Sequence, residues 1–264
     1  MNIALGVFDG VHRGHQKIIA RAHLVLTITP HPNPEIRLLT SPAEKKDLIG
    51  NIAEFEFTER NARLTPENFI SWLKQKYNPA EIIIGHDFHF GYQRQGNAAV
   101  LRRLGEKYNF SVTEVPEYKW QKEIVRSSAI RKYLLAGELK KANALLGREY
   151  QLNGKVAHGK HLGRKLGFPT ANLRLDCPQK LVPADGVYSG EAIAGNKLYT
   201  AAIFVGDKKI EAHLLDFNGN LYGRKITLLL KDYLRPNKKF TDAKSLAAQI
   251  RKDVRKIRKL KSSQ

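Results

Sequence analysis

The chain has 264 residues, enough for two cores at the usual prior of roughly 100–200 residues per domain. No apolar run approaches the roughly 18–20 residues that a membrane span needs. The only cysteine, Cys177, excludes an internal disulfide and a cysteine-based zinc site. The first residues lack the charged and apolar regions of a signal peptide. We therefore expect a cytoplasmic enzyme with no membrane partner.

The formal net charge of +20 favours anionic partners, which include ATP, pyrophosphate and flavin phosphates as well as nucleic acid. The densest basic run is Arg251–Lys259. Apolar residues in and before this run form one stripe of a helix: Leu246, Ile250, Val254 and Ile257. Aromatic residues do not interleave with the basic ones, as a stacking platform for single strands requires. We expect a solvated helix face and no nucleic-acid partner; an RNA-binding tail is the alternative.

Strand-like and helical segments alternate up to about Gly147. The expected strands are Asn2–Phe8, Val25–Thr29, Glu81–Gly85 and Ser111–Val115. The expected helices run from Arg13 to His23, from the capping box Ser41-Pro42-Ala43-Glu44, from Thr65, and from Asn97 to Tyr108. This order favours a parallel sheet covered by helices on both faces.

The turn Gly6–His15, between the first strand and the first helix, has the features of a phosphate-binding loop. Gly10 and Gly14 let backbone and phosphate approach closely, and the helix start directs N–H groups toward a ligand. His12 and His15 are three residues apart, so both can face one phosphate. Adenylyl transfer needs such preorganised donors around the α-phosphate and no protein nucleophile. The alternatives are a zinc-binding pair, for which no third ligand is in an obvious arrangement, and a simple glycine turn, which does not explain the histidines.

After Gly147 the chain contains short strands separated by Gly, Asn and Pro, which favours an antiparallel barrel or sandwich closed by the C-terminal helix. The expected strands are Tyr150–Ala157, Val187–Ala194, Leu198–Val205, Ile210–Leu215 and Lys225–Leu234. The boundary is expected near residues 146–149, which gives domains 1–147 and 148–264.

A second candidate phosphate loop, Gly163–Asn172, lies in this half. Its two glycines flank a basic pair, as in a flap over phosphates. Pro169 fixes the backbone before Thr170 and Asn172, whose short side chains can reach Mg2+ and phosphate oxygens together. Alternation places both on one face if the segment is extended. A Gly/Pro loop followed by an edge strand is the alternative.

The sequence pattern Phe-Asp-Gly-Val-His-x-Gly-His in the first loop resembles the HxGH signature of nucleotidyltransferases. Together with Gly85–Gly91 and Arg126–Arg131 it resembles the bacterial bifunctional riboflavin kinase/FAD synthetase family. Gly163–Asn172 and Glu211–Phe217 resemble the flavokinase signature of that family. The resemblance implies an α/β, Rossmann-like nucleotidyltransferase domain followed by a six-stranded antiparallel β-barrel flavokinase domain with a C-terminal helix.

The resemblance also implies two reactions with Mg2+. Riboflavin and ATP give FMN, and FMN and a second ATP give FAD and pyrophosphate. Riboflavin, FMN and ATP are then the expected partners, and FMN and FAD are the products.

For the adenylyltransferase half, the resemblance implies that His12 and His15 are catalytic and that Asp87 binds flavin. The residues it implies for ATP binding are Phe8, Gly14, Ser127, Ser128 and Arg131.

For the kinase half, it implies that Glu211 is the base that takes the proton from the riboflavin 5′-hydroxyl and that Arg235 binds flavin. Thr170 and Asn172 are the implied metal-binding residues. The residues implied for ATP binding are Gly163, Lys165, Thr170 and Asn172.

The sequence departs from the family pattern mainly in the kinase half. A longer loop is usual after Gly206, whereas this chain continues directly through Asp207-Lys208-Lys209-Ile210 to Glu211. Phe204 stands where Asn is common, and Pro236 where an acidic residue is usual. We expect an active kinase with weak flavin binding; the alternative is an FMN adenylyltransferase whose kinase half is weak or inactive.

Overall fold

The structure, a computed structural model, describes residues 1–159, 163 and 166–262. The chain divides into two compact units, Met1–Ser127 and Ser128–Gln264. Within the described ranges, no helix is long and apolar enough to cross a membrane.

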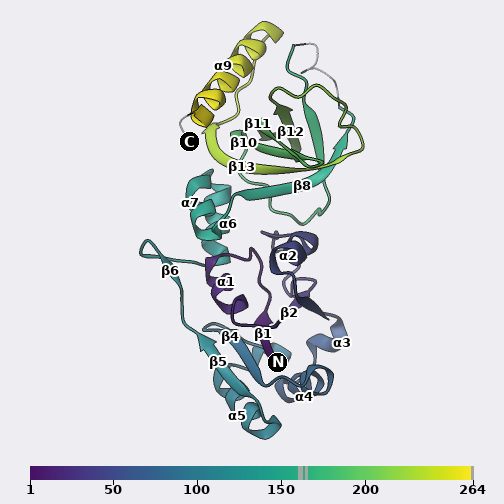
Figure 1. Cartoon of the computed structure of the whole chain (residues 1–264), viewed down its shortest axis with the longest axis vertical. Helices are drawn as coiled ribbons and strands as arrows, with labels where there is room; N and C mark the ends of the chain where they lie inside the picture. Colours follow the sequence, from purple (N-terminus) through teal and green to yellow (C-terminus); the bar gives the residue numbers. More distant parts are fainter. Residues whose placement is uncertain (160–162, 164–165, 263–264) are drawn as a thin grey trace. The chain divides into compact units, whose positions relative to one another are not determined.

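The first unit is built on a five-stranded parallel sheet with the strand order β3-β2-β1-β4-β5 (Figure 1). The strands are β1 (Asn2–Gly6), β2 (Leu24–Thr29), β3 (Ile52–Glu56), β4 (Glu81–Gly85) and β5 (Ser111–Val115). The chain adds β2 and β3 on one side of β1, then β4 and β5 on the other. The carboxyl ends of β1 and β4 therefore border a topological switch point, where open α/β sheets bind ligands.

Helices cover both faces of this sheet. They are α1 (Arg13–Ile19), α2 (Pro42–Ile49), α3 (Glu59–Ala62), α4 (Pro66–Tyr77) and α5 (Ala98–Tyr108), with a short 3-10 turn η1 (Tyr92–Arg94). Phe69 of α4 and Leu101 of α5 join Ile84 in one buried cluster. Ile18 of α1 packs with Ile83 in another. Neighbouring residues of β4 thus face opposite layers, which explains its uninterrupted isoleucine run.

A small antiparallel hairpin and two helices follow the sheet. They are β6 (Lys119–Trp120), β7 (Glu123–Ile124), α6 (Ser127–Leu135) and α7 (Leu139–Leu146). In the second unit, Asn143 of α7 joins the helix to the barrel strands. Its Nδ2 donates to the Leu230 carbonyl at 2.9 Å, and its Oδ1 accepts from the Tyr150 N–H at 2.9 Å. Gly147 ends α7 with a φ of 79°.

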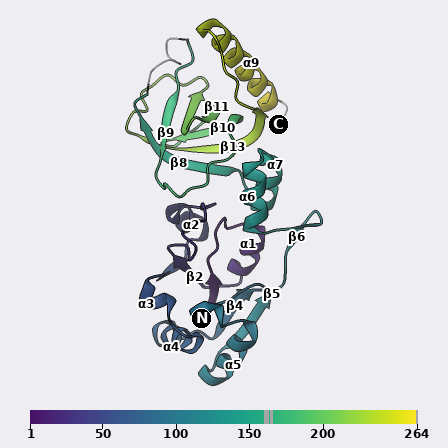
Figure 2. The same ribbon diagram turned by 180° about the vertical axis from the view of Figure 1, so that it is seen from behind.

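The second unit contains a closed antiparallel barrel with the order β10-β11-β12-β9-β8-β13 (Figure 2). Its strands are β8 (Tyr150–Ala157), β9 (Ala171–Leu175), β10 (Gly186–Ala194), β11 (Lys197–Gly206), β12 (Lys209–Leu214) and β13 (Lys225–Arg235). Helix α9 (Ala243–Ser262) lies along the outside of the barrel, with Ile257 buried. The expected parallel sheet, barrel and C-terminal helix are confirmed.

Several element bounds differ from the expectations. Strand β1 ends at Gly6 instead of Phe8, because Phe8 has a φ of 50° and leaves the β region. Strand β3 was not expected from its sequence, because it is an edge strand in which only Phe55 is buried. The first helix ends at Ile19, four residues before the predicted end at His23.

Candidate functional site

The turn between β1 and α1 contains left-handed backbone at non-glycine residues. Phe8 has a φ of 50° and Val11 a φ of 40°, with Gly10 at 92° between them. Such conformations persist only where the surrounding structure fixes them. Buried polar contacts to neighbouring segments supply that fixation here.

The carboxylate of Asp9 ties this turn to the segment before α2. Asp9 is 4% exposed; its Oδ1 accepts the N–H of Leu39 at 2.9 Å and the N–H of Thr40 at 3.1 Å. The Thr40 hydroxyl donates to Asp9 Oδ1 at 3.3 Å and accepts from the Gly10 N–H at 3.0 Å. The carboxylate is thus satisfied by backbone and hydroxyl donors inside the unit, so we assign it a structural task in shaping the loop.

Below the turn, a buried lysine is bonded to the loop. Lys45 Nζ donates to the Val7 carbonyl at 2.8 Å and to Thr27 Oγ1 at 3.1 Å. The Thr27 hydroxyl donates in turn to the Val7 carbonyl at 3.0 Å. Burial lowers the pKa of Lys45, and the charges of Asp9 and Glu54 partly oppose this shift.

His12 and His15 form one stacked pair at the start of α1. Their ring centroids are 3.5 Å apart with planes inclined by 19°. His12 is 5% exposed, and its Nδ1 accepts the N–H of His15 at 3.2 Å. A neutral His12 ring therefore carries its proton on Nε2 and can donate it to a ligand. A Cβ on Gly14 would lie 3.3 Å from the His12 ring, so the glycine leaves room for this arrangement.

The other residues predicted for adenylyl transfer have different placements. The Phe8 ring meets the His15 ring edge-on, with centroids 5.3 Å apart. Ser127 is the first residue of α6, and its hydroxyl donates to the Asp9 carbonyl at 2.7 Å. Ser128 and Arg131 follow in α6, within the second unit.

Asp87 lies directly beyond β4, at the same sheet edge as the histidine loop. Strands β1 and β4 are adjacent and parallel, so their carboxyl ends meet there. A Cβ on Gly85 would lie 3.5 Å from Asp87 Oδ1, which places the carboxylate beside the end of the strand. The switch point is therefore bordered by the histidine pair on one strand end and by an exposed carboxylate on the other.

In the barrel, three predicted kinase residues lie together. The Thr170 hydroxyl donates to Glu211 Oε2 at 3.1 Å. Glu211 on β12 pairs in register with Asn172 on β9. Thr170, Ala171 and Asn172 all line the pocket beside this pair, so the expectation that Thr170 and Asn172 share one face stays a prediction.

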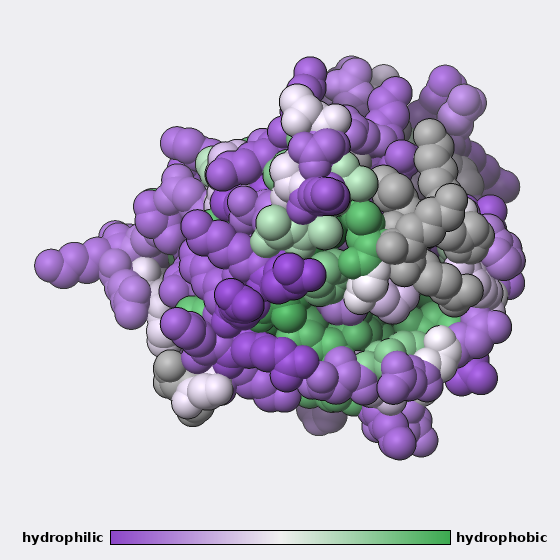
Figure 3. Space-filling model, turned by 90° about the horizontal axis from the view of Figure 1, so that it is seen from above, coloured by the Kyte–Doolittle hydropathy of each residue, from purple (hydrophilic) through white to green (hydrophobic). Residues whose placement is uncertain are grey.

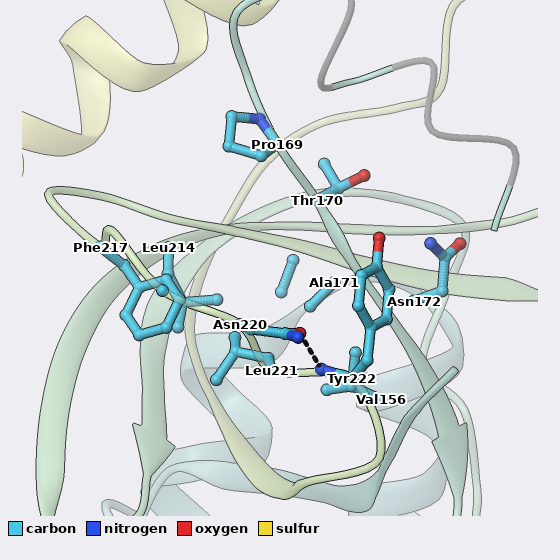
Figure 4. Close-up of a pocket in the computed structure, with 12 residues that line it drawn as sticks. Val156, Pro169, Thr170, Ala171, Asn172, Leu214, Phe217, Asn220, Leu221 and Tyr222 are labelled. Carbon is cyan, nitrogen blue, oxygen red and sulfur yellow. Dashed lines mark hydrogen bonds between the residues drawn. The ribbon is translucent and has the colours of Figure 1, made fainter. Parts of the chain in front are cut away.

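This pocket combines polar and apolar walls (Figure 4). Phe217 and Leu214 lie on one side of it and Asn172 on the other. Seen from the barrel end, apolar side chains gather in a hollow within a hydrophilic rim (Figure 3). The lining residues are Val156, Pro169, Thr170, Ala171, Asn172, Ala212, Leu214, Phe217, Gly219, Asn220, Leu221 and Tyr222. Such a site suits a flat ring with a polar end.

Two glycines make close approaches to the same residues. A Cβ on Gly159 would lie 2.2 Å from Asn172 Nδ2, and one on Gly163 would lie 2.4 Å from the Phe168 carbonyl oxygen and 3.1 Å from Thr170 Oγ1. Any larger residue would displace the side chains that line the pocket. Lys165, which was predicted to bind ATP, lies outside the described residues.

Arg235 is engaged elsewhere in the second unit. Its Nε donates to both Asp253 oxygens at 3.1 Å and its Nη2 to Asp253 Oδ2 at 2.6 Å. Among the described residues, it is not one that lines the pocket beside Thr170. The structure therefore does not bring Arg235 together with Thr170, Asn172 and Glu211.

The segment before Glu211 is a two-residue hairpin turn. Asp207 and Lys208 have φ angles of 50° and 58°, the left-handed pair of a type I′ turn. Asn237 Nδ2 donates to the Val205 carbonyl at 2.9 Å, and a Cβ on Gly206 would lie 2.1 Å from the same nitrogen. The shortened connection is thus a tight, packed turn.

Sequence reasoning missed the groups that hold the first loop and one aromatic side chain near the second site. The capping box does fix the start of α2: Ser41 Oγ accepts from the Glu44 N–H, and the Glu44 carboxylate accepts from the Ser41 N–H. It thereby sets the face on which Lys45 lies, but no sequence signal pairs Lys45 with Val7. His158, whose ring stacks on Tyr222 with centroids 4.2 Å apart, was likewise not singled out.

Comparison with known proteins gives a consistent result for both units. A family model for FAD synthetase matches residues 1–129, and one for riboflavin kinase matches residues 146–261. These matches define a transferase with two catalytic domains.

Relatives and a solved structure match almost the whole chain. A bifunctional riboflavin kinase/FMN adenylyltransferase from Buchnera aphidicola subsp. Schizaphis graminum is 35% identical, covering 97% of this chain and 93% of the relative. The Escherichia coli K12 protein of the same description is 31% identical, covering 95% and 90%. A Streptococcus pneumoniae protein whose crystal structure is described as that of a macrolide-efflux protein has a TM-score of 0.86 at 29% identity, covering 97% and 93%. The chain belongs to the bifunctional riboflavin kinase/FMN adenylyltransferase family.

Proposed function

We propose that this chain phosphorylates riboflavin to FMN and then adenylylates FMN to FAD, with ATP as the co-substrate of both reactions. The observation that carries the proposal is the presence of one separate candidate site in each unit. The stacked histidines lie at the sheet switch point, within the part matched by the FAD synthetase family. The Thr170–Glu211 pair lies in the barrel, within the part matched by the riboflavin kinase family.

In adenylyl transfer, a phosphate oxygen of FMN attacks the α-phosphorus of ATP, and the bond to the bridging oxygen of the leaving pyrophosphate breaks. We assign His12 and His15 the task of donating to the oxygens that gain charge, because the bond at Nδ1 places the proton of a neutral His12 ring on Nε2. Phe8, Gly14, Ser127, Ser128 and Arg131 are the proposed ATP-binding residues, and Asp87 the proposed flavin-binding residue.

In phosphorylation, the Glu211 carboxylate accepts the proton of the riboflavin 5′-hydroxyl as its oxygen attacks the γ-phosphorus and ADP leaves. The Thr170 hydroxyl, bonded to Oε2, orients this carboxylate. The hydroxyl of Thr170 and the amide oxygen of Asn172 are hard oxygen donors of the kind that suits Mg2+, which when bound neutralises phosphate charge. Gly163, Lys165, Thr170 and Asn172 remain the proposed ATP-binding residues.

The proposed flavin-binding role of Arg235 competes with its ion pair. The Arg235 and Asp253 side chains are 16% and 9% exposed, so the pair is well shielded from water. An arginine that binds flavin would have to share or break this pair. We keep the role as a prediction that an Arg235→Lys variant tests through its KM for riboflavin.

The proposed domains are residues 1–147 and 148–264. A fragment starting at Arg148 should fold alone if the barrel and α9 enclose a complete core, and should melt cooperatively. Aggregation of this fragment would place the boundary before α7, whose Asn143 is bonded to barrel strands. A cytoplasmic location is part of the proposal, because ATP serves both reactions.

Product analysis tests the whole proposal. Purified protein incubated with riboflavin, ATP and Mg2+ should form FMN and then FAD, and FMN with ATP should form FAD and pyrophosphate. The tight turn at Asp207 and Lys208 favours weak flavin binding in the kinase half. If the protein makes FAD from FMN but never FMN from riboflavin, the adenylyltransferase-only alternative replaces the bifunctional one.

A further inference from the structure

Lys45 is a buried charged residue at the base of the histidine loop. It lies on α2 and is 8% exposed. Its ammonium, the Thr27 hydroxyl and the Val7 carbonyl form a closed triangle of hydrogen bonds with lengths of 2.8, 3.1 and 3.0 Å. Thr27 is 0% exposed and pairs in register with Gly6, the last residue of β1. The triangle therefore fixes the point at which the chain leaves the sheet and enters the loop.

The Thr27 hydroxyl and the Val7 carbonyl do not need the ammonium as a hydrogen-bond partner, because they are bonded to each other. The Val7 carbonyl already accepts from the Thr27 hydroxyl. The charged groups facing the ammonium are Asp9 from the loop and Glu54 from β3, and burial outweighs both, so the pKa of Lys45 is lowered. An apolar side chain of similar length is often as good for folding at such a position, or better. A charge kept there against its desolvation penalty points to a role in the reaction.

The loop that Lys45 supports carries the histidine pair. Only three residues, Asp9 to Val11, separate the left-handed Phe8 from His12, so a shift at Val7 moves the His12 ring. ATP, FMN and pyrophosphate are all anionic, and a fixed positive charge beneath their loop favours them electrostatically.

We propose that Lys45 is a positioning residue for adenylyl transfer: it holds the Val7 carbonyl and Thr27 hydroxyl, and through them the direction of His12, while its charge lies beneath the phosphate-binding turn. This inference rests on the proposed FMN adenylyltransferase function of the loop. It assigns a reaction-linked task to a lysine that does not contact the substrates.

The test compares Lys45→Met with Lys46→Met in the full chain, since Lys46 is the exposed neighbour on the same helix. We expect Lys45→Met to lower kcat for FAD formation by about 10- to 100-fold, the scale of a misplacement near 1 Å. KM for ATP and FMN should change by less than about threefold, because binding groups remain. Riboflavin phosphorylation and the melting temperature should not fall. Lys45→Arg, which keeps the charge, should recover part of kcat.

Each other outcome overturns the inference. Equal kcat in Lys45→Met and Lys46→Met would show that the ammonium is dispensable. A parallel fall in melting temperature and kcat, or a failure to fold, would give Lys45 a structural role only. The almost isosteric Thr27→Val variant then provides a second check. An unchanged kcat in Thr27→Val would show that the hydrogen-bond triangle does not position the loop. Wild-type protein that makes no FAD at all would instead refute the proposed function.

Discussion

The two candidate sites are built in different ways. The first depends on the backbone conformation of the turn after β1, which hydrogen bonds of Asp9 and Lys45 hold in place. This turn presents the stacked rings of His12 and His15. The second depends on side chains at one place in the barrel, where Thr170, directly before β9, donates to Glu211 of the neighbouring strand β12. A site of the first kind can lose function when its loop shifts with every active group still present, whereas one of the second kind is sensitive mainly to replacement of the groups themselves.

The largest effect is expected from Glu211, because one carboxylate carries the proposed proton transfer. Glu211→Gln keeps the shape and the acceptor for the Thr170 hydroxyl but removes the base. Riboflavin phosphorylation should fall by about 10²–10⁴-fold in steady-state assays. FMN adenylylation, measured in the same preparation, serves as the control. Phosphorylation at wild-type rate would remove Glu211 from the mechanism.

The histidine pair should show a somewhat smaller effect, in the other reaction. His12→Ala or His15→Ala should each lower FAD formation by about 10²–10³-fold, as expected for the loss of one preorganised donor. Because the rings stack, the double variant should lose less than the product of the two single losses. Riboflavin phosphorylation is the control. Near-normal FAD synthesis in the double variant would refute the assignment.

The difference between the two sites also explains what the sequence could predict. Thr170, Asn172 and the glycines of both loops are local patterns, and alternation along one extended segment predicts that Thr170 and Asn172 share a face. The histidines three residues apart were predictable for the same reason. The Lys45–Val7 contact spans 38 residues and the Asp9–Leu39 contact 30, so neither is visible in a local window. Contacts of this kind depend on strand order, which the sequence alone does not specify.

The same limit applies to parts of the fold. The three consecutive isoleucines of β4 are typical of a buried central strand. The sequence of Ile52–Glu56 has no comparable apolar run, and only one residue of this edge strand is buried. The family resemblance implies that Arg235 binds flavin, but its partner Asp253 lies on α9, 18 residues further along the chain. A charged residue in a motif can serve the ligand or the packing of the fold, and only the tertiary contact shows which partner it has.

A smaller effect, on stability and not on chemistry, is expected at Asn143. Asn143→Ala removes the two bonds that join α7 to the Leu230 carbonyl and the Tyr150 N–H. The free energy of unfolding of the second unit should fall by about 1–3 kcal/mol, because two polar groups lose their partner. Chemical denaturation measures the loss, and kcat of both reactions should be preserved. An unchanged midpoint would show that α7 contributes little to the barrel.

The smallest expected effect is the pH dependence of stability that Lys45 adds to the first unit. Its folded-state pKa is lowered from 10.5 by burial, so the folded state holds fewer protons than the unfolded state as the pH approaches that value. The desolvation penalty on the ammonium is therefore fully present below the folded-state pKa and disappears as the pH rises toward 10.5. Wild-type protein should gain stability relative to Lys45→Met as the pH rises toward 10.5, as measured by denaturant unfolding of both proteins at each pH. The difference between the two proteins cancels the titration of all other groups. If the stability of wild-type protein relative to Lys45→Met stays constant or falls as the pH rises, the ammonium is well solvated. The argument that a buried charge is kept for adenylyl transfer would then lose its energetic support.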